Sequence, residues 1–408
     1  MKLKKRLLLF LALALVMALA VGCGAPKQEE GKKEEPKQEQ EEGQKEAAAE
    51  PIKIGVNYEL SGAVATFGQH TVNGIKLALA EVNDAGGVLD GSQIEPIILD
   101  NKSEGAESTS VATKLITSEK VVAHLGAATT GNTLAAVPIA TQYKVPLLTT
   151  SATNPKVTVD DSGNVREYIF RTCFIDPPQA IVGAEFAYND LGGKKAAIYF
   201  DNTNDYSKGL AEVFEEEFVK LGGEIVSKEA FSPQDNDFRP VVTKFKQAGA
   251  DVVYVPGYYQ QVGLIINQAR EIGLDAPFLG ADGWDSPKLV EIAGAEALNN
   301  TFFTNHYASS DPSEKVQKFV EAYKAEYGEV PSSFAALGYD AAKLIVDAIE
   351  RAGSADPDAI KDALAATKDF DAVTGKLTFD ENHNPIKEIA IIEMLDGNQE
   401  LKTKKAPK

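Results

Sequence analysis

Short apolar segments alternate with longer amphipathic segments along most of the chain. Residues 52–60, IKIGVNYEL, predict a strand, and residues 71–84 carry apolar side chains at helical spacing. Further strand-like segments follow, each separated by a helix-length segment: QIEPIILD, VVAHLG, VPLLTT, AAIYFD, DVVYVPG and APFLGAD. The alternation predicts an α/β fold of mostly parallel sheets flanked by helices. In such sheets ligands bind beyond the carboxyl ends of the strands.

Two segments of this pattern resemble each other. Residues 111–126 and 241–257 both contain a Val-x-Thr-Lys helix followed by a strand that ends at glycine. Chance similarity between two helix–strand units is the alternative. We interpret the likeness as two lobes of similar topology, in which the strand ends at Gly126 and Gly257 face each other across a cleft.

The chain before residue 51 has a different character. A basic start precedes an apolar run from Leu7 to Val21, which is shorter than the roughly 20 residues of a membrane-spanning helix. We therefore predict an export signal over residues 1–22, with a short anchor helix as the alternative. The residues ending at Cys23 resemble a bacterial lipobox, whose cysteine is lipidated. Residues 23–50 are almost entirely polar and predict a disordered tether. We expect a lipid-anchored protein on the outer face of a bacterial cell membrane.

Composition narrows the classes of function. The formal net charge of −19 argues against nucleic-acid binding. Cys173 is the one cysteine besides Cys23, so we expect no intramolecular disulfide and a packing role for Cys173. The four histidines are scattered and have no metal-ligand spacing, and the familiar catalytic and dinucleotide-binding motifs are absent from the sequence. We predict neither an enzyme nor a cofactor.

The segment GAATTGNT, residues 126–133, follows a predicted strand and opens a helix. It fits the phosphate-binding loop pattern except that Asn132 replaces the lysine that pairs with terminal phosphates. Nucleotide binding is therefore disfavoured. The helix amides and the hydroxyls of Thr129 and Thr130 suit a singly charged anion such as a carboxylate. Plain helix capping is the alternative for this motif taken alone.

The segment PLLTTSATNP, residues 146–155, begins as an apolar strand and ends in uncharged hydroxyl side chains. Ser, Thr, Asn and Pro are common in turns and helix caps, which is the simpler interpretation. Its position at the predicted carboxyl end of a strand favours a second one. We predict that these hydroxyls donate to a ligand.

Aromatic residues and one acid follow the strands of the second half. Tyr206, the pair Tyr258 and Tyr259, and Asp282 with Trp284 each lie just after a predicted strand. Individually such residues are more often packing or turn residues. Together they predict an apolar-walled site with one carboxylate, suited to an ammonium. Combined with neutral donors in the other lobe, this arrangement matches a free α-amino acid.

The ordered set of these motifs resembles the substrate-binding proteins of branched-chain amino acid ABC transporters, the Leu/Ile/Val-binding family. The resemblance covers residues 51–395 and rests on IKIGVNYELSG, FGQHTVNGIKLALAEVNDAGGV, GAATTGNT, TTSATNP, NDYSKGLA, GYYQQVG and GADGWDS. It implies the two-lobed type I periplasmic-binding-protein fold, with a ligand cleft between lobes and three hinge crossings.

The resemblance assigns ligand contacts to the first lobe. Thr130 stands where the family commonly uses Ser to bind the ligand carboxylate. Ala152, through its backbone, and Thr153 match the next contacts. Phe67 falls where the family often has Tyr near the ligand side chain, which implies a drier pocket.

In the second lobe, Tyr206 and Asp282 match the family residues that hold the ammonium group. Tyr258 matches the first of the paired aromatics, with Tyr259 as the alternative contact. Asp282 is one methylene shorter than the Glu of some members, which leaves ligand size open.

The resemblance also implies where the chain crosses between lobes, near 172–176, 301–306 and 374–377. Lobe one then comprises residues 51–172 and 307–373. Lobe two comprises residues 177–300 and the C-terminal segment 378–408.

The function implied is capture of an aliphatic amino acid, by lobe closure, for delivery to an ABC permease by a monomeric protein. One alternative keeps the fold and changes the ligand to an amide, urea or aromatic acid. Asp282 separates the two, because a ligand without an ammonium leaves that carboxylate buried and unpaired. Two further alternatives are a sensory binding protein that signals through a partner and an extracytoplasmic enzyme, which the missing motifs disfavour.

Overall fold

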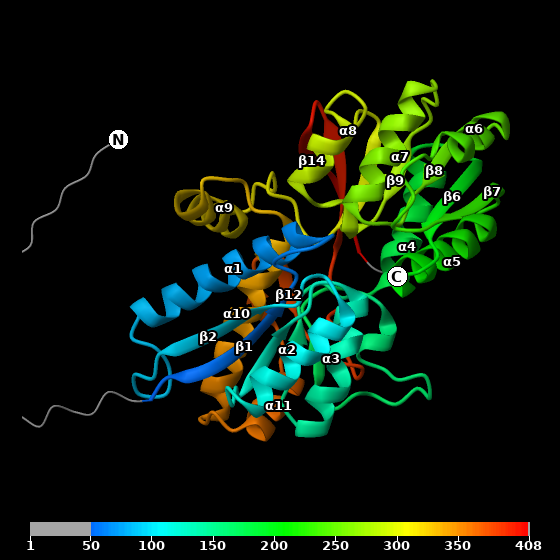
Figure 1. Ribbon diagram of the computed structural model, residues 1–408. Helices are drawn as coiled ribbons and strands as arrows, with labels where there is room; N and C mark the ends of the chain where they lie inside the picture. The colour runs from blue at the N-terminus through cyan, green and yellow to red at the C-terminus, as the bar shows by residue number, and fades with distance from the viewer. Residues whose placement is uncertain (1–49, 407–408) are drawn as a thin grey trace, which may run out of the picture. The chain divides into compact units, whose positions relative to one another are not determined.

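The computed structural model describes residues 50–406. The predicted export signal, Cys23 and nearly all of the predicted tether lie outside these residues. Figure 1 shows two groups of strands, each covered by its own helices. Within residues 50–406, no helix is both long enough and apolar enough to cross a membrane.

The first sheet has five parallel strands in the order β2-β1-β3-β4-β5. Its strands are β1 (Ile52–Tyr58), β2 (Ile94–Asp100), β3 (Ala123–Gly126), β4 (Leu147–Thr149) and β5 (Ile169–Arg171). The helices that pack on it are α1 (Ala65–Asp84), α2 (Gly105–Thr117), α3 (Thr130–Tyr143), α10 (Ser333–Ala352) and α11 (Pro357–Ala365). With α9 (Glu314–Tyr327), the short 3-10 helix η1 (Pro155–Val157) and the hairpin of β11 (Phe370–Ala372) and β12 (Gly375–Leu377), they form the first lobe.

The second sheet has seven strands in the order β14-β13-β10-β9-β8-β6-β7. Its strands are β6 (Lys195–Asp201), β7 (Glu224–Phe231), β8 (Val252–Tyr254), β9 (Phe278–Gly280), β10 (Thr301–Asn305), β13 (Ile389–Leu395) and β14 (Asn398–Lys405). The helical segments of this second lobe are α4 (Asp176–Glu185), η2 (Phe186–Asp190), α5 (Asp205–Lys220), α6 (Arg239–Gln247), α7 (Tyr259–Glu271), η3 (Asp282–Trp284) and α8 (Pro287–Ala293). The strands β13 and β14 run antiparallel to their neighbours.

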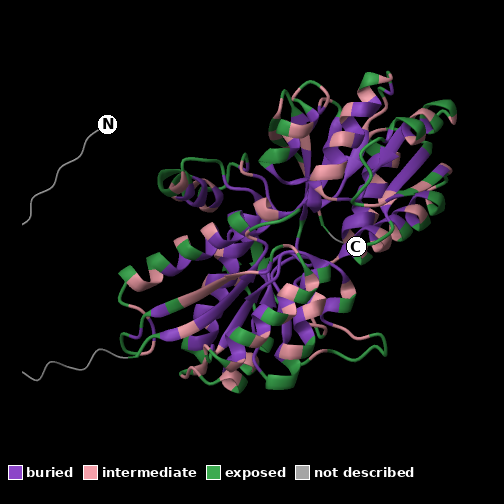
Figure 2. Ribbon diagram, viewed as in Figure 1, coloured by how far each residue is buried: buried purple, intermediate pink, exposed green. Residues whose placement is uncertain are grey.

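The burial pattern follows from the sequence pattern. The strands β3, β4, β8, β9 and β10 are buried along their whole length, as expected for parallel strands covered on both faces. The flanking helices expose their outer faces (Figure 2). The long helices α1 and α10 pack closely because both carry glycine at the contact. A Cβ on Gly338 would lie 2.3 Å from the carbonyl oxygen of Thr71.

The chain passes between the lobes after β5, after β10, and between β12 and β13. The last two passages begin later than the ranges read from the sequence. Residues 301–305 form β10, which pairs with β9 and β13 inside the second sheet, and residues 375–377 form β12 in the first-lobe hairpin. Strands of only three to five residues at such points look like connecting segments in the sequence.

A buried lysine links the first and third passages between the lobes. The ammonium of Lys387, between β12 and β13, donates to the carbonyl oxygen of Thr172 at 3.2 Å and to the hydroxyl of Thr374. Asp340 of α10 accepts from the same Thr374 hydroxyl at 2.6 Å and from the amide of Val373 at 2.7 Å. Burial lowers the pKa of Lys387, and the carboxylate of Asp340 opposes that shift. The hinge region is thus held by polar contacts inside the protein.

Candidate ligand-binding site

Residues from both lobes enclose a small cavity at the carboxyl ends of the strands. Its volume is about 10 Å³, close to the space that one water molecule needs. Its lining contains Phe67, Ala128, Thr129, Thr130, Ser151, Tyr206, Tyr258, Asp282, Gly283 and Phe334. Five of the seven predicted ligand contacts line this cavity, whereas the other two, Ala152 and Thr153, are buried residues outside its lining. An amino acid needs more room, so binding one requires the lobes to separate and close again.

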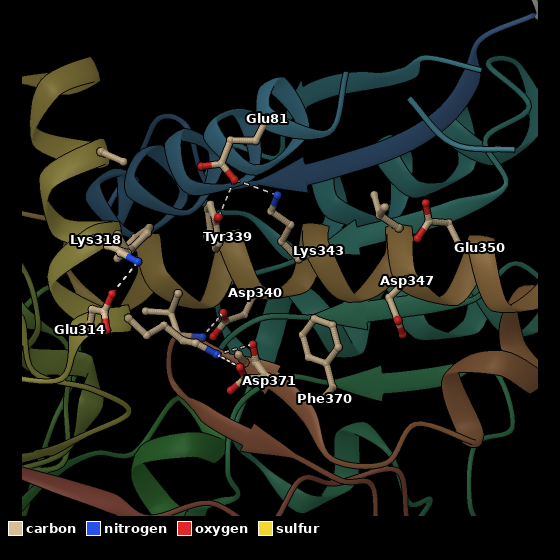
Figure 3. A pocket seen from close by; sticks show the side chains of 16 residues that line it. Glu81, Glu314, Lys318, Tyr339, Asp340, Lys343, Asp347, Glu350, Phe370 and Asp371 are labelled. Carbon is tan, nitrogen blue, oxygen red and sulfur yellow. Dashed lines mark hydrogen bonds and ion pairs between the residues drawn. The ribbon is translucent and has the colours of Figure 1, made fainter. Parts of the chain in front are cut away.

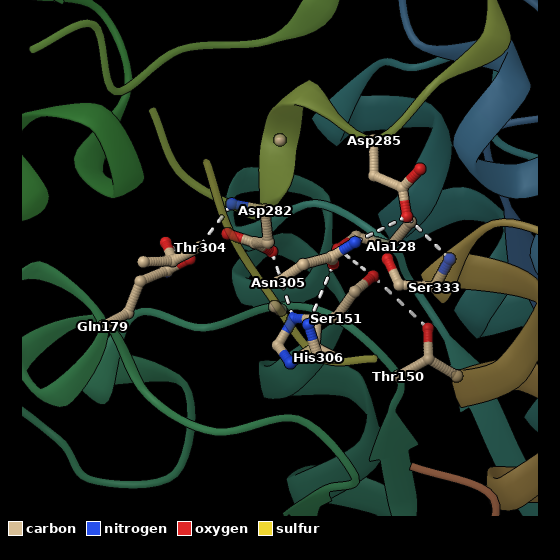
Figure 4. A network of polar contacts seen from close by, with 12 residues as sticks. Ala128, Thr150, Ser151, Gln179, Asp282, Asp285, Thr304, Asn305, His306 and Ser333 are labelled. Atoms are coloured by element: carbon tan, nitrogen blue, oxygen red, sulfur yellow. Dashed lines mark hydrogen bonds and ion pairs between the residues drawn. The ribbon is translucent and has the colours of Figure 1, made fainter. Parts of the chain in front are cut away.

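The charged side of the site is Asp282, which opens η3 directly after β9. Its side chain is 3% exposed. One carboxylate oxygen accepts from the Tyr206 hydroxyl at 2.8 Å, and the other lies 3.2 Å from Nε2 of His306. The backbone amide of Asp282 donates to Oε1 of Gln179 at 3.0 Å, as Figure 4 shows. The carboxylate is therefore held on both sides by protein groups.

Aromatic rings from both lobes form the walls. The Tyr206 and Tyr258 rings stack with centroids 5.3 Å apart. Phe67 of α1 meets the Tyr258 ring edge-on at 5.6 Å and stacks on Phe334 at 4.1 Å. Burial raises the pKa of both Tyr206 and Tyr258 well above the usual range, and the charge of Asp282 adds to the shift. Both phenols stay protonated and present an apolar face to the cavity.

Gly283 allows the backbone to approach these rings. Its amide donates to the Tyr206 hydroxyl at 3.0 Å. A Cβ at this position would lie 2.9 Å from both the Tyr206 oxygen and a ring carbon of Tyr258. A larger residue would push the two aromatic rings out of the cavity wall.

The first lobe supplies two buried hydroxyl groups at the site. Thr130, the first residue of α3, and Thr153, after β4, are both buried. The side-chain oxygen of each lacks a hydrogen-bond partner among residues 50–406. Buried hydroxyls are normally paired. The Thr130 hydroxyl is therefore free to donate to a ligand, whereas the Thr153 hydroxyl also influences the Asp176 carboxyl. The ligand roles of both stay predictions.

The amides just before α3 are already occupied, which corrects part of the sequence interpretation. The buried carboxylate of Glu59 accepts from the amides of Ala128 at 3.1 Å and Thr129 at 3.2 Å. It also accepts from the Thr129 hydroxyl at 3.0 Å and from Nδ2 of Asn132 at 2.8 Å. The anion at this helix terminus is the protein's own side chain. The capping alternative holds for Thr129, whose hydroxyl also accepts from the amide of Asn132.

Most hydroxyls of the segment 146–155 support the fold. Thr149 donates to the carbonyl of Ala127 at 2.7 Å, and Ser151 donates to the carbonyl of Ala128 at 2.9 Å. Thr150 accepts from the Tyr58 hydroxyl at 3.2 Å. The expectation that the whole cluster serves a ligand is therefore wrong, and Thr153 alone of the four is unpaired within the described chain.

Asp176 is a site residue that the sequence analysis missed. It begins α4 immediately after the first crossing and is 1% exposed. Neither carboxyl oxygen has a hydrogen-bond partner in the described part of the chain. Burial raises the pKa of Asp176 well above its usual range, the charge of Asp282 adds to this shift, and Thr153 and Arg171 oppose it. The cleft thus contains a second carboxyl group near Asp282, without a hydrogen-bond partner of its own.

Direct hydrogen bonds join the two lobes around the cavity. The Asp285 carboxylate, in the second lobe, accepts from the amide of Ser333 at 2.7 Å, at the start of first-lobe helix α10. It also accepts from Nδ2 of Asn305 at 2.9 Å (Figure 4). Asn154 donates to the carbonyl of Asp205 at 3.0 Å. The lobes are therefore in direct contact at more than one place.

Other features do not form a competing site. A cavity of about 810 Å³ lies on the first lobe between α1, α9 and α10 (Figure 3). Its charges are largely matched, for example Lys343 with Glu81 and Lys318 with Glu314. Among residues 50–406 no group of three or more His, Cys, Asp or Glu side chains is arranged to hold a metal ion. Burial raises the pKa of Cys173 to about 12, which fits a packing residue.

The fold and the site define a two-lobed α/β binding protein of the type I periplasmic class. The family model described as periplasmic binding protein matches residues 51–399. The chain belongs to this family, whose members are extracytoplasmic substrate-binding proteins, and it is therefore a binding protein and not an enzyme.

The chain is also similar to individual proteins whose names state a ligand. It is 31% identical over 334 residues to the leucine-, isoleucine-, valine-, threonine-, and alanine-binding protein of Pseudomonas aeruginosa, covering 82% of this chain and 87% of the relative. The branched-chain amino acid transporter substrate binding protein LivJ of Streptococcus pneumoniae, solved with isoleucine, aligns with a TM-score of 0.82 and 41% identity over 87% of this chain and 99% of that chain. A solute binding protein of an ABC transporter from Rhodopseudomonas palustris BisB5, solved with 3,4-dihydroxybenzoic acid, gives a TM-score of 0.77 and 29% identity over 88% and 98%.

The raised pKa of Asp176 leads to a prediction about the pH dependence of stability. Its folded-state pKa lies above the ordinary value of 3.8, so the folded protein binds the proton more tightly and loses stability as pH rises above 3.8. Asp176→Asn removes this penalty. We expect it to raise the free energy of unfolding of the ligand-free protein by about 1–3 kcal/mol at pH 8, with the gain vanishing near pH 4.

Urea unfolding followed by circular dichroism from pH 4 to pH 8 measures this gain. The exposed Asp84 at the end of α1 is the matched control, and Asp84→Asn should give little change at any pH. A pH-independent effect of Asp176→Asn would show that the Asp176 carboxyl is not held neutral by burial.

Proposed function

We propose that the protein captures a free α-amino acid with an aliphatic side chain and delivers it to an ABC permease. The observation that carries this proposal is the division of chemistry across the cavity. The first lobe offers the unpaired hydroxyls of Thr130 and Thr153, and the second offers the buried carboxylate of Asp282 beside two tyrosine rings. An α-carboxylate and an α-ammonium on one carbon fit these two sides.

The proposed ligand contacts come from both lobes. Thr130, Thr153 and the backbone at Ala152 bind the ligand carboxylate, while Tyr206 and Asp282 bind the ammonium. Phe67 and Tyr258 contact the side chain. The isoleucine-bound and multi-specific relatives support an aliphatic amino acid as the ligand. Closure of the lobes about the three crossings buries the ligand and completes the surface that the permease meets.

Asp176 adds to the case for a cationic group. It lies close enough to Asp282 for the two charges to interact, and two buried carboxyl groups repel unless one stays protonated. Burial favours the protonated form of Asp176, so the cleft presents the charge of Asp282, which a ligand ammonium matches. The site is thus electrostatically suited to one positive charge, which favours an amino acid over a simple carboxylic acid.

A second candidate ligand is an aromatic acid, which the structural neighbour from Rhodopseudomonas palustris favours. A thermal-shift screen separates the candidates, with aliphatic amino acids, small amides, urea and benzoate as the panel. A compound at 100 times its dissociation constant stabilises the fold by about 2.7 kcal/mol. Stabilisation by benzoate, with no response to any amino acid, would reject the amino-acid proposal.

Asp282→Asn should separate an amino acid from its deaminated analogue. Removing one partner of a buried charge pair costs about 2–5 kcal/mol, so L-leucine should bind the variant about 30-fold to several-thousand-fold more weakly. The analogue 4-methylpentanoate has no ammonium and should gain relative to L-leucine. Calorimetry of both compounds with both proteins gives the coupling free energy. Equal losses for the two compounds would mean that Asp282 only shapes the cleft.

We further propose that Cys23 anchors the protein to the membrane through lipid, with residues 23–50 as tether. Cys23→Ala, expressed in a bacterial host, should move the protein from the membrane fraction to the soluble or precursor pool. Cys173→Ala is the matched control, because Cys173 is buried in the folded body, and it should stay in the membrane fraction. Membrane retention of a Cys23→Ala protein with a normally removed leader would contradict lipidation.

A further inference from the structure

Among residues 50–406, His306 is the one side chain outside the cavity lining with a polar contact to the Asp282 carboxylate. It directly follows β10, and its side chain is 1% exposed. Its Nε2 atom lies 3.2 Å from an oxygen of Asp282. The ring packs on Phe174 with centroids 3.8 Å apart, and Figure 4 shows it facing Asp282. His306 therefore forms the support behind the Asp282 carboxylate.

The geometry determines where the imidazole proton lies. An ionised carboxylate can only accept hydrogen bonds, so Nε2 carries the hydrogen and donates it to Asp282. Nδ1 is buried and has no hydrogen-bond partner among residues 50–406, so the neutral tautomer leaves it unprotonated. Protonation would place a buried N–H at Nδ1 with nothing in the described chain to accept it.

The charges around the ring are few. Burial is the main influence and lowers the pKa of His306, whereas the hydrogen bond and charge of Asp282 oppose the shift. Lys387, between β12 and β13, lowers the pKa further, and Asp285, after η3, raises it. Asp176 of α4 faces the other partner, Asp282. In the free protein near neutral pH the imidazole is uncharged and acts as a neutral donor.

We propose that His306 is a positioning residue for the ammonium site, and that its protonation weakens amino-acid binding at low pH. As a neutral donor it fixes one Asp282 oxygen while the Tyr206 hydroxyl fixes the other, so the carboxylate keeps its orientation toward the cavity. As an imidazolium it competes with the ligand ammonium for that same charge. This inference rests on the proposed amino-acid function.

The sign of the pH effect follows from linkage. A ligand ammonium placed beside Asp282 adds positive charge near His306 and disfavours its protonation, so binding releases a proton from any protonated imidazole. The dissociation constant for L-leucine should therefore rise as pH falls below the imidazole pKa, by up to about ten-fold per pH unit for one released proton. Asp176 titrates in the same cleft, so the contribution of His306 is the difference between wild type and a His306 variant.

Calorimetry with L-leucine from pH 5 to pH 8 measures this difference. His306→Gln keeps an N–H donor but cannot titrate, so we expect an affinity within about three-fold of wild type at pH 8 and a shallower loss at low pH. His306→Leu removes the donor and should weaken L-leucine about ten-fold at pH 8. His124→Leu is the matched control, since His124 is buried in β3 without a hydrogen-bond partner in the described chain. It should retain the wild-type pH profile.

The deaminated compound 4-methylpentanoate tests whether His306 acts through the charge of Asp282. Its affinity should not fall in His306→Leu as that of L-leucine does, because it presents no ammonium. A wild-type pH slope in His306→Gln, or equal losses for both compounds in His306→Leu, would overturn the proposal and leave His306 as a packing residue.

Histidine nitrogen NMR on the ligand-free protein separates this inference from the proposed function. We expect an Nε2–H tautomer at His306 and a lower imidazole pKa in Asp282→Asn, because that change removes the opposing charge. An Nδ1–H tautomer, or an unchanged pKa, would overturn the pairing even if L-leucine binds. The expected NMR result without binding of any amino acid would refute the proposed function and the competition, while the His306–Asp282 pair itself would stand.

Discussion

Burial of carboxylates away from water is the constraint on which this cleft depends. An ionised carboxyl group inside a protein is strongly destabilising unless donors or cations surround it. Glu59 meets this requirement with helix amides and neighbouring side chains, and Asp285 meets it with the start of α10. Asp282 has only the Tyr206 hydroxyl and the His306 ring at its oxygens, and Asp176 has no hydrogen bond to its carboxyl oxygens within residues 50–406. Because Asp282 and Asp176 have few or no donors around their carboxyl oxygens, the site favours a cation.

The same constraint gives the two lobes different chemistry at the cleft. In the first lobe, the buried Glu59 carboxylate is compensated by protein donors, and neutral hydroxyls remain for a ligand. In the second lobe, negative charge is left partly uncompensated beside aromatic rings whose own hydroxyls stay protonated. The polarity of the cleft is thus set by which carboxylates found partners during folding. The total number of acidic residues, which is large across the whole chain, does not determine it.

Periodicity and order along the chain were sufficient to predict the alternating α/β architecture and the location of the site at strand ends. They could not separate structural hydroxyls from free ones, because Thr149 and Thr153 have the same chemistry and differ only in whether a carbonyl lies within reach. Glu59 and His306 were missed for a related reason. Each acts on a segment far away in the sequence, at residues 128–132 and 282 respectively. Spatial pairing of this kind leaves no local pattern. Two passages between the lobes start later in the chain than the sequence suggested. The reason is that β10 and β12 are too short to be recognised as strands before their pairing partners are known.

The hydrogen bonds between the lobes have a mechanical consequence. Asp285 with the amide of Ser333, and Asn154 with the carbonyl of Asp205, join groups that water also solvates well. Each such bond contributes a net stabilisation of only about 0.5–1.5 kcal/mol, because opening exchanges it for hydration. These hydrogen bonds therefore make only a small contribution to the difference in free energy between joined and separated lobes. Polar contacts of this kind align the two lobes yet oppose their separation only weakly.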